Sequence, residues 1–354
     1  MTYSYLDRAI HRIAFAHPIV QRSLNAIETD LFAKDLPLNA VDRPVFVTAL
    51  PRAGTTLVLN LLYGTGAFAS YTYRHMPFPM APLFWSKATG GARKAAVETE
   101  RKHGDGMAFG FDSPEAFEEV LWLNLLGDKI RADDHLRALS AEDVDEDSAD
   151  VLRATIAKLL HAESGERRYL SKNNANVSRL PAVRSVFPGA RIIVPFRDPF
   201  GHVGSLQKQH DQFLALHGKD RFAEDYMRWL GHHDFGANFL PLGFEGIRKP
   251  EVADTEFWLT YWCAAYEHVL ADGDVFLADY EALCAEPVSA LAALAAAADI
   301  PPTSDYLAQA DGMRNATSRP ADRTRVSAAL LKRAETIHQE LKVRAGAMAH
   351  RKAA

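Results

Sequence analysis

Short apolar runs rich in β-branched residues recur along the chain, and proline, glycine or polar residues bound each of them, which is typical of buried strands. The runs occupy residues 43–50, 168–172, 190–196 and 274–279. Apolar residues at helical spacing follow the first run at 55–63 and the last at 288–298. Because parallel strands are joined by crossovers that are usually helices, this alternation predicts an α/β fold with a central parallel sheet flanked by helices.

No repeat, low-complexity segment or shift in composition divides the chain. We therefore expect one domain over residues 1–354, with its core at about 44–300 and a helical tail at about 301–354. Residues 1–35 carry apolar positions at helical spacing on both sides of Pro18, and this pattern predicts two short amphipathic helices.

A mainly helical insertion that covers the sheet is predicted at about residues 82–161. One of its helices is expected to start with Ser113 as the cap and Pro114 in the first turn. The acidic run at 141–147 is predicted to be the solvated start of another helix, without a functional role.

The composition excludes several classes of protein. Of 354 residues, 48% are hydrophobic and 24% charged, which excludes disordered, collagen-like and coiled-coil chains. The 40 Lys and Arg against 45 Asp and Glu give a net charge of -5 and argue against nucleic-acid binding. The two cysteines, Cys263 and Cys284, fit a reducing compartment. With neither a signal-peptide pattern nor a membrane-spanning apolar run, the chain is expected to be soluble and cytoplasmic.

The loop after the first predicted strand has the features of an anion-binding site. Its residues are Pro51, Arg52, Ala53, Gly54, Thr55 and Thr56. A loop that opens a helix gathers unpaired backbone N–H groups at the positive end of the helix dipole. Gly54 allows close approach of the backbone, and Arg52 supplies a fixed positive charge. Thr55 and Thr56 add hydroxyl donors, so a phosphate or sulfate is the expected ligand and a plain strand-to-helix turn is the alternative.

This loop differs from the Walker A loop of ATPases. Ala49 stands at the position of the first Walker glycine, and Thr55 stands at the position of the lysine. These differences argue against an ATPase.

A second anion site is predicted after the strand at 190–196. Arg197 follows that strand directly, and Ser205 lies eight residues later on the next helix. Arginine can bind phosphate through two N–H groups, and a serine hydroxyl can donate once more. A simple ion pair of Arg197 with Asp198 is the alternative. Because the carboxyl ends of parallel strands share one edge of a sheet, the two sites are expected to bind two phosphates of one nucleotide.

These segments carry a family resemblance. Residues 51–56 resemble the 5′-phosphosulfate loop, and Arg197 with Ser205 resembles the 3′-phosphate motif, of sulfotransferases that use 3′-phosphoadenosine 5′-phosphosulfate (PAPS). The resemblance covers about residues 44–300. It implies a P-loop-like fold, PAPS as the donor cosubstrate and no metal ion.

The sequence departs from this family in two places. Ala53 replaces the commoner serine of the phosphosulfate loop. The Arg-Lys-Gly segment of cytosolic aryl sulfotransferases is absent near the C-terminus, and Arg319 is the nearest candidate for its contact with the nucleotide phosphate.

The resemblance also implies catalytic cations. Arg52 is expected to bind the 5′-phosphosulfate and to stabilise its bridging oxygen. Lys172, at the end of a predicted strand, stands where tyrosylprotein and related sulfotransferases carry a lysine. Its ammonium would neutralise the leaving phosphate, and an ordinary surface lysine is the alternative. The run His232, His233 and Asp234 is predicted to be a surface loop rather than a metal site.

A general base is needed for the acceptor hydroxyl. His75 is the expected base, because its segment resembles the one that holds the catalytic histidine of cytosolic sulfotransferases. Glu115, Glu118 and Glu119 compete with it, since other sulfotransferases use a glutamate.

The expected reaction is sulfuryl transfer by in-line displacement to a hydroxyl of a glycoside, glycolipid or small hydroxylated metabolite. A small-molecule kinase and a non-catalytic nucleotide-binding protein are the alternatives. The residues expected to line the acceptor site are Tyr73, Met76, Phe78, Phe84 and Trp85.

Overall fold

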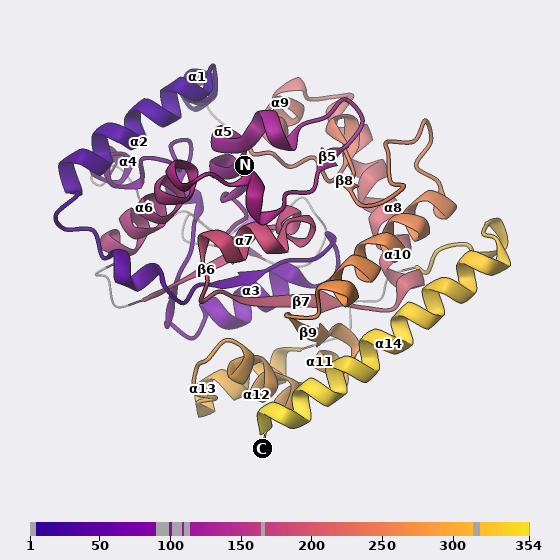
Figure 1. Cartoon of the computed structure of the whole chain (residues 1–354). Helices are drawn as coiled ribbons and strands as arrows, with labels where there is room; N and C mark the ends of the chain where they lie inside the picture. Colours follow the sequence, from indigo (N-terminus) through magenta and orange to yellow (C-terminus); the bar gives the residue numbers. More distant parts are fainter. Residues whose placement is uncertain are drawn as a thin grey trace.

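A parallel sheet of five strands in the order β2-β6-β1-β7-β9 lies at the centre of the molecule (Figure 1). The computed structural model describes residues 5–89, 99–100, 108–109, 114–163, 167–313 and 319–353. The strands are β1 (Val45–Val47), β2 (Phe68–Ala69), β6 (Arg168–Lys172), β7 (Arg191–Phe196) and β9 (Phe276–Asp279). The predicted α/β fold with a central parallel sheet is therefore confirmed.

Alternate side chains of the central strands enter two different hydrophobic cores. Val45, Val47 and Ile193 pack on one face of the sheet. Phe46 and Val194 pack on the opposite face. Because these side chains are completely buried, the strands are apolar on both faces, as expected for a sheet with helices on both sides.

Helices cover both faces of this sheet. The helices that pack on the Val45 face are α3 (Thr55–Tyr63), α11 (Tyr280–Ala285), α12 (Pro287–Ala297) and α13 (Ser304–Leu307). The helices that pack on the Phe46 face are α5 (Glu119–Ile130), α6 (Glu146–Ala162), α7 (Leu180–Val186), α8 (Pro199–His217), α10 (Thr255–Asp272) and α14 (Ala328–Ala353). In Figure 1, the C-terminal helix α14 runs along α10 and past α11 and α12.

The insertion between β2 and β6 is mainly helical, as predicted. Besides α5 and α6 it contains α4 (Pro82–Thr89) and the short strands β3 (Thr99–Glu100), β4 (Ala108–Phe109) and β5 (Leu136–Arg137). Strand β5 pairs with β8 (Leu242–Gly243), which follows α9 (Arg221–Trp229).

The helix start predicted at residues 113–114 is wrong. Pro114 forms a β-bridge with Thr72, and the N–H of Glu115 donates to the carbonyl of Tyr71 at 2.8 Å. This pairing keeps the backbone extended, so α5 begins only at Glu119. Ser113 lies outside the described residues.

The acidic run at 141–147 does start a helix. The carboxylate of Asp145 accepts the N–H of Ser148 at 2.8 Å and caps α6. The side chains of this run are largely exposed, which confirms the prediction of a solvated helix start.

The two predicted N-terminal helices are α1 (Tyr5–Ala14) and α2 (Pro18–Phe32). Helix α2 turns polar side chains toward the protein and leaves Ile19 and Leu31 60% and 67% exposed. Among the buried ones, Asn25 donates to the carbonyl of Met80 at 2.8 Å. Hydrogen bonds and the buried ion pair of Glu28 with Lys158 thus attach this helix to the rest of the protein.

Of the helices in the described ranges, none combines the length and the apolar composition needed to cross a bilayer.

Candidate active site

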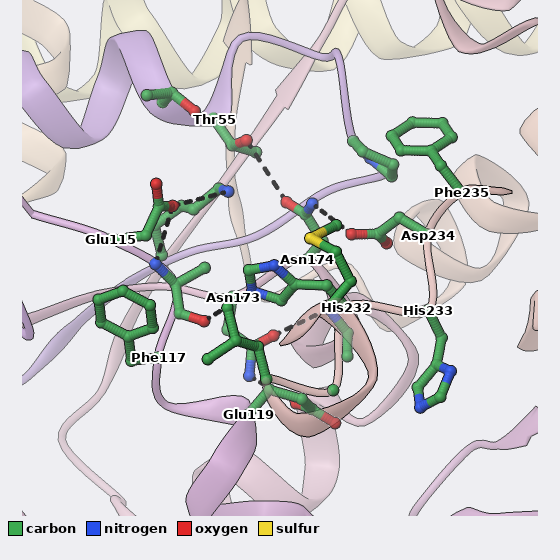
Figure 2. Close-up of a pocket in the computed structure, with 18 of the residues that line it drawn as sticks. Thr55, Glu115, Phe117, Glu119, Asn173, Asn174, His232, His233, Asp234 and Phe235 are labelled. Carbon is green, nitrogen blue, oxygen red and sulfur yellow. Dashed lines mark hydrogen bonds and ion pairs between the residues drawn. The ribbon is translucent and has the colours of Figure 1, made fainter. Parts of the chain in front are cut away.

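The carboxyl ends of β1, β6 and β7 meet at one edge of the sheet, and a pocket with about 170 Å³ of open volume lies there. It is lined by the loop after β1, the end of β6, the segment before α5, helices α8 and α9, and the loop after α9. Figure 2 shows Glu115 and Asp234 on opposite sides of this pocket, with Asn174 and His232 between them.

The loop at 51–56 depends on a glycine at position 54 for its conformation. Gly54 has a φ of 102°, and a Cβ on it would lie 2.8 Å from Cδ2 of Tyr280. Only glycine suits this position, because other residues rarely adopt that φ and the ring leaves no space. Helix α3 then begins at Thr55, whose hydroxyl donates to Asn174 Oδ1 at 3.4 Å. Thr56, next on α3, also lines the pocket.

Ala53, the departure from the family pattern, is completely buried in the hydrophobic core. A methyl group is apolar, so it needs no hydrogen-bond partner there, whereas a buried serine hydroxyl would. An alanine therefore fits the packing beneath the loop.

The two predicted anion sites lie side by side. Nε of Arg52 donates to the hydroxyl of Ser205 at 3.1 Å, which joins the first loop to helix α8. The guanidinium of Arg197 is 4.9 Å from the ring centroid of Tyr280, the same ring that packs on Gly54. The residues expected to bind two phosphates of one nucleotide therefore converge at one edge of the sheet.

Glu281 lies beside Arg197, with its Oε1 at 4.0 Å from Nε. Burial raises the pKa of Glu281, while the backbone N–H of Asp198 and the charge of Arg197 act in the opposite direction. The alternative pair of Arg197 with Asp198 is not formed among the described contacts, because Asp198 caps α8 instead by accepting the N–H of Gly201.

Arg319 lies next to the same helix. A Cβ on Gly204 would lie 2.1 Å from the carbonyl oxygen of Arg319, so this glycine allows the two segments to touch. The N–H of Ala321 donates to the carbonyl of Phe200 at 2.9 Å and holds the segment at 319–321 against helix α8. The backbone of Arg319 thus passes directly beside the residue that precedes Ser205.

Lys172 and Glu115 form a charged pair at the pocket. Nζ of Lys172 is 3.8 Å from Oε1 of Glu115, and their side chains are only 11% and 9% exposed. The hydroxyl of Tyr73 donates to Oε2 of Glu115 at 3.0 Å. Lys172 is therefore a pocket residue and not an ordinary surface lysine.

The other candidate bases have different surroundings. His75 is 6% exposed and its Nδ1 accepts the N–H of Thr72 at 3.0 Å; among the described residues that line the pocket, Glu115 is present and His75 is not. Glu118 accepts hydrogen bonds from Trp122, Tyr169 and Asn176. Glu119 reaches the pocket lining but forms a buried ion pair with Arg179.

The acceptor side of the pocket differs from the sequence prediction. Of the five aromatic and apolar residues predicted there, Tyr73 lines the pocket and Met76, Phe78, Phe84 and Trp85 do not. The apolar residues that sequence analysis missed are Phe117, Leu136, Phe213, Met227, Leu230, Phe235, Leu240 and Leu242, together with Tyr226. Most come from α9, β8 and their connection, which carried no motif.

Residues 232–234 form a loop, as predicted, but it lines the pocket and is only partly exposed. His233 is only 7% exposed. Nε2 of His232 donates to the carbonyl of Ala116 at 3.0 Å, and Asp234 accepts from Asn174 at 3.4 Å (Figure 2). In the part of the chain that the structure describes, no group of three His, Cys, Asp or Glu side chains could hold a metal ion.

Comparisons with known proteins show the family and the fold. A family model described as the sulfotransferase family matches residues 44–305. The structure of sulfotransferase STF9 from Mycobacterium avium is similar with a TM-score of 0.50 at 17% identity, over 87% of this chain and 76% of that one. Sulfotransferase STF1 from Mycobacterium tuberculosis H37Rv gives a TM-score of 0.50 at 15% identity, over 97% and 86%. No curated protein sequence matches the chain.

The matching family model covers most of the chain, so the protein belongs to the sulfotransferase family. The two solved structures share its P-loop-like fold.

Proposed function

We propose that this protein transfers a sulfuryl group from PAPS to an acceptor hydroxyl. The observation that carries the proposal is the Arg52–Ser205 contact, which brings the loop at 51–56 together with the helix that follows Arg197. A donor with phosphates at both ends of its ribose needs two adjacent anion sites, and membership of the family supports the same donor.

In this proposal one anion site binds the 5′ end of the nucleotide and the other binds its 3′-phosphate. The N-terminus of α3, with Thr55, Thr56 and Arg52, holds the 5′-phosphosulfate. Arg197 and Ser205 hold the 3′-phosphate, and Arg319 adds a charge from the segment that crosses at Gly204. No metal ion is required, because a sulfuryl group carries less charge than a phosphoryl group.

The proposed transfer reaction uses Glu115 and Lys172, which form the charged pair at the pocket. Glu115 accepts the proton of the acceptor hydroxyl while the acceptor oxygen forms a bond to sulfur. The bond from sulfur to the 5′-phosphate oxygen breaks, and the electron pair stays on that oxygen. Lys172 and Arg52 stabilise the developing negative charge. We assign the base to Glu115 in place of His75, because Glu115 lines the pocket beside Lys172.

The lining of the pocket supports an acceptor with an apolar body. Its far side carries leucine, phenylalanine and methionine side chains, among them Met227, Leu230 and Phe235, next to the polar loop at 232–234. The apolar side chains suit an apolar group on the acceptor, and the polar loop offers partners for its hydroxyls. We therefore favour a glycolipid or a small hydroxylated metabolite over a free glycoside as the acceptor. We also propose that the enzyme is a single domain that acts in the cytoplasm.

A transfer assay with matched acceptors tests this function. PAPS would be supplied with a 4-alkylphenol, octyl glucoside or glucose, and formation of 3′-phosphoadenosine 5′-phosphate (PAP) and sulfated acceptor would be measured. We expect transfer to the two acceptors that carry apolar groups and none to glucose. Turnover of ATP with magnesium would instead support a kinase, and PAP binding without transfer to any acceptor would support a non-catalytic protein.

A further inference from the structure

His202 is a buried histidine on α8, between Arg197 and Ser205, and it has no role in the chemistry above. The indole N–H of Trp262 donates to its Nδ1 at 3.2 Å, and its Nε2 donates to the carbonyl oxygen of Pro51 at 2.7 Å. Since an indole N–H only donates and a carbonyl only accepts, the imidazole is neutral with its proton on Nε2. Burial lowers the pKa of His202 to about 3, and the charges of Arg197 and Arg52 act in the same direction.

The carbonyl that His202 holds belongs to the peptide that leads into Arg52. In a planar trans peptide the C=O and the N–H point in opposite directions. With the Pro51 oxygen held against α8, the N–H of Arg52 points away from that helix. Arg52 also has a φ of 71°, a region that non-glycine residues rarely adopt, so the surrounding contacts must maintain it.

A second contact from the same helix supports this arrangement. Ser205 lies one turn after His202 and binds Nε of Arg52 at 3.1 Å. Helix α8 therefore holds both the backbone before Arg52 and its side chain. A flip of the Pro51–Arg52 peptide would turn the carbonyl oxygen, with its partial negative charge, to the side where the N–H now points.

We infer that His202 is a positioning residue: it holds the Pro51–Arg52 peptide so that the anion-binding loop presents an N–H rather than a carbonyl oxygen to its ligand. This inference rests on the proposed use of the loop for the phosphosulfate end of the donor.

Two carboxamide variants separate the two hydrogen bonds of His202. In His202→Gln the amide nitrogen takes the place of Nε2 and can still donate to Pro51. In His202→Asn the shorter side chain can still accept from Trp262 but does not reach Pro51. Crystal structures of both variants should show the original Pro51–Arg52 peptide in the Gln variant and a flipped or rotated one in the Asn variant. An unchanged peptide in the Asn variant would overturn the inference.

Calorimetry with PAP measures the consequence for binding. We expect His202→Asn to weaken PAP binding about tenfold and His202→Gln to stay within about threefold of the wild type. The control is His268→Asn, at a half-buried histidine on α10 that packs on Phe244; this change should leave PAP affinity unchanged. Equal losses in all three variants would show a general effect on folding and contradict a positioning role.

If His202→Asn does not fold, Trp262→Phe serves in its place. It removes the donor that fixes the tautomer and leaves the histidine present, so PAP affinity should fall by less than tenfold but measurably. Wild-type affinity in Trp262→Phe would then overturn the inference. Failure of the wild-type protein to bind PAP would contradict the proposed function, while the peptide orientation in the variant structures would still decide the role of His202.

Discussion

At the scale of single residues, the candidate site depends on contacts between side chains that are far apart in the sequence. Lys172 was identifiable because it ends a strand, and Arg52 because it lies in a loop that opens a helix. Glu115 and Ser205 were candidates too, but their contacts with Lys172 and Arg52 are recognised only when the chain is folded. Local pattern therefore predicts the cations of the site better than it predicts the base.

The assignment of the base can be tested by two matched variants. Glu115→Gln should lower kcat for sulfuryl transfer by about 10² to 10⁴-fold, because the amide cannot accept the proton, and should leave PAP affinity nearly unchanged. His75→Gln should retain kcat, since His75 is absent from the described lining of the pocket. Steady-state kinetics with saturating PAPS measures both. Loss of transfer in His75→Gln with normal rates in Glu115→Gln would reverse the assignment.

At the scale of helices and strands, the close approach of two backbones determines which segments lie near the candidate site. Helix α8 can pass beside residues 319–321 only because residue 204 has no Cβ. Side-chain polarity matters for helix α2, which packs on the protein through its polar face rather than its apolar face. Sequence periodicity predicted that α2 is a helix but could not predict which face is buried.

Gly204→Ala tests the crossing of the C-terminal segment. The added methyl group would lie 2.1 Å from the carbonyl oxygen of Arg319, so that segment must move away from α8. We expect weaker PAP binding, by roughly three- to thirtyfold, because Arg319 loses its place beside the 3′-phosphate site. Gly127→Ala is the control, as its nearest neighbour would be an arginine side chain at 3.7 Å. Equal PAP affinity in both variants, by calorimetry, would argue against a role for Arg319.

The buried pair Glu28–Lys158 attaches α2 to α6, with 3.2 Å between Nζ and Oε2 and both side chains fully buried. Removing one charge leaves the other uncompensated, so Lys158→Met should lower the free energy of unfolding by about 3–5 kcal/mol. Glu28→Gln combined with Lys158→Met should recover part of this loss. Urea denaturation measures each variant. A double variant no more stable than Lys158→Met alone would show that the two charges do not interact.

At the scale of the whole molecule, four of the five strands of the sheet and the loop at 51–56 were predictable, because each carries its signal in a few consecutive residues; the two-residue strand β2 was not predicted. The acceptor side was not, because its apolar lining comes from α9, β8 and a loop that meet only after long-range packing. The position of the loop at 232–234 in the pocket was not predictable for the same reason, since it also depends on long-range packing. Its histidines have no apolar periodicity around them, yet folding places them inside the pocket.

Buried and half-buried histidines also make stability depend on pH. Burial lowers the pKa of His11, His202, His210, His217, His233, His268 and His338 below the ordinary value of 6.5. The unfolded chain therefore binds more protons than the native protein below pH 6.5, so stability is complete above that pH and is lost as the pH falls.

His202 alone should contribute a slope of about 1.4 kcal/mol per pH unit between its unfolded pKa of 6.5 and its folded pKa of about 3. Urea denaturation of the wild type and His202→Gln between pH 7 and pH 5 isolates this contribution, since glutamine does not titrate. We expect a shallower pH dependence in the variant. Parallel curves for the two proteins would show that the pKa of His202 is the same in the native and unfolded states, which would contradict the assignment of a neutral, buried imidazole.

We propose that one edge of the sheet binds a nucleotide through its 3′-phosphate and its 5′-phosphate together. Calorimetry of PAP and ATP binding to the wild type, Arg197→Ala and Arg191→Ala tests it most directly, because Arg191 lies exposed at the opposite end of the same strand. We predict that PAP binds more tightly than ATP, that Arg197→Ala weakens PAP binding by roughly 10 to 100-fold, and that Arg191→Ala does not. A preference for ATP, or equal PAP affinity in the wild type and Arg197→Ala, would contradict this account.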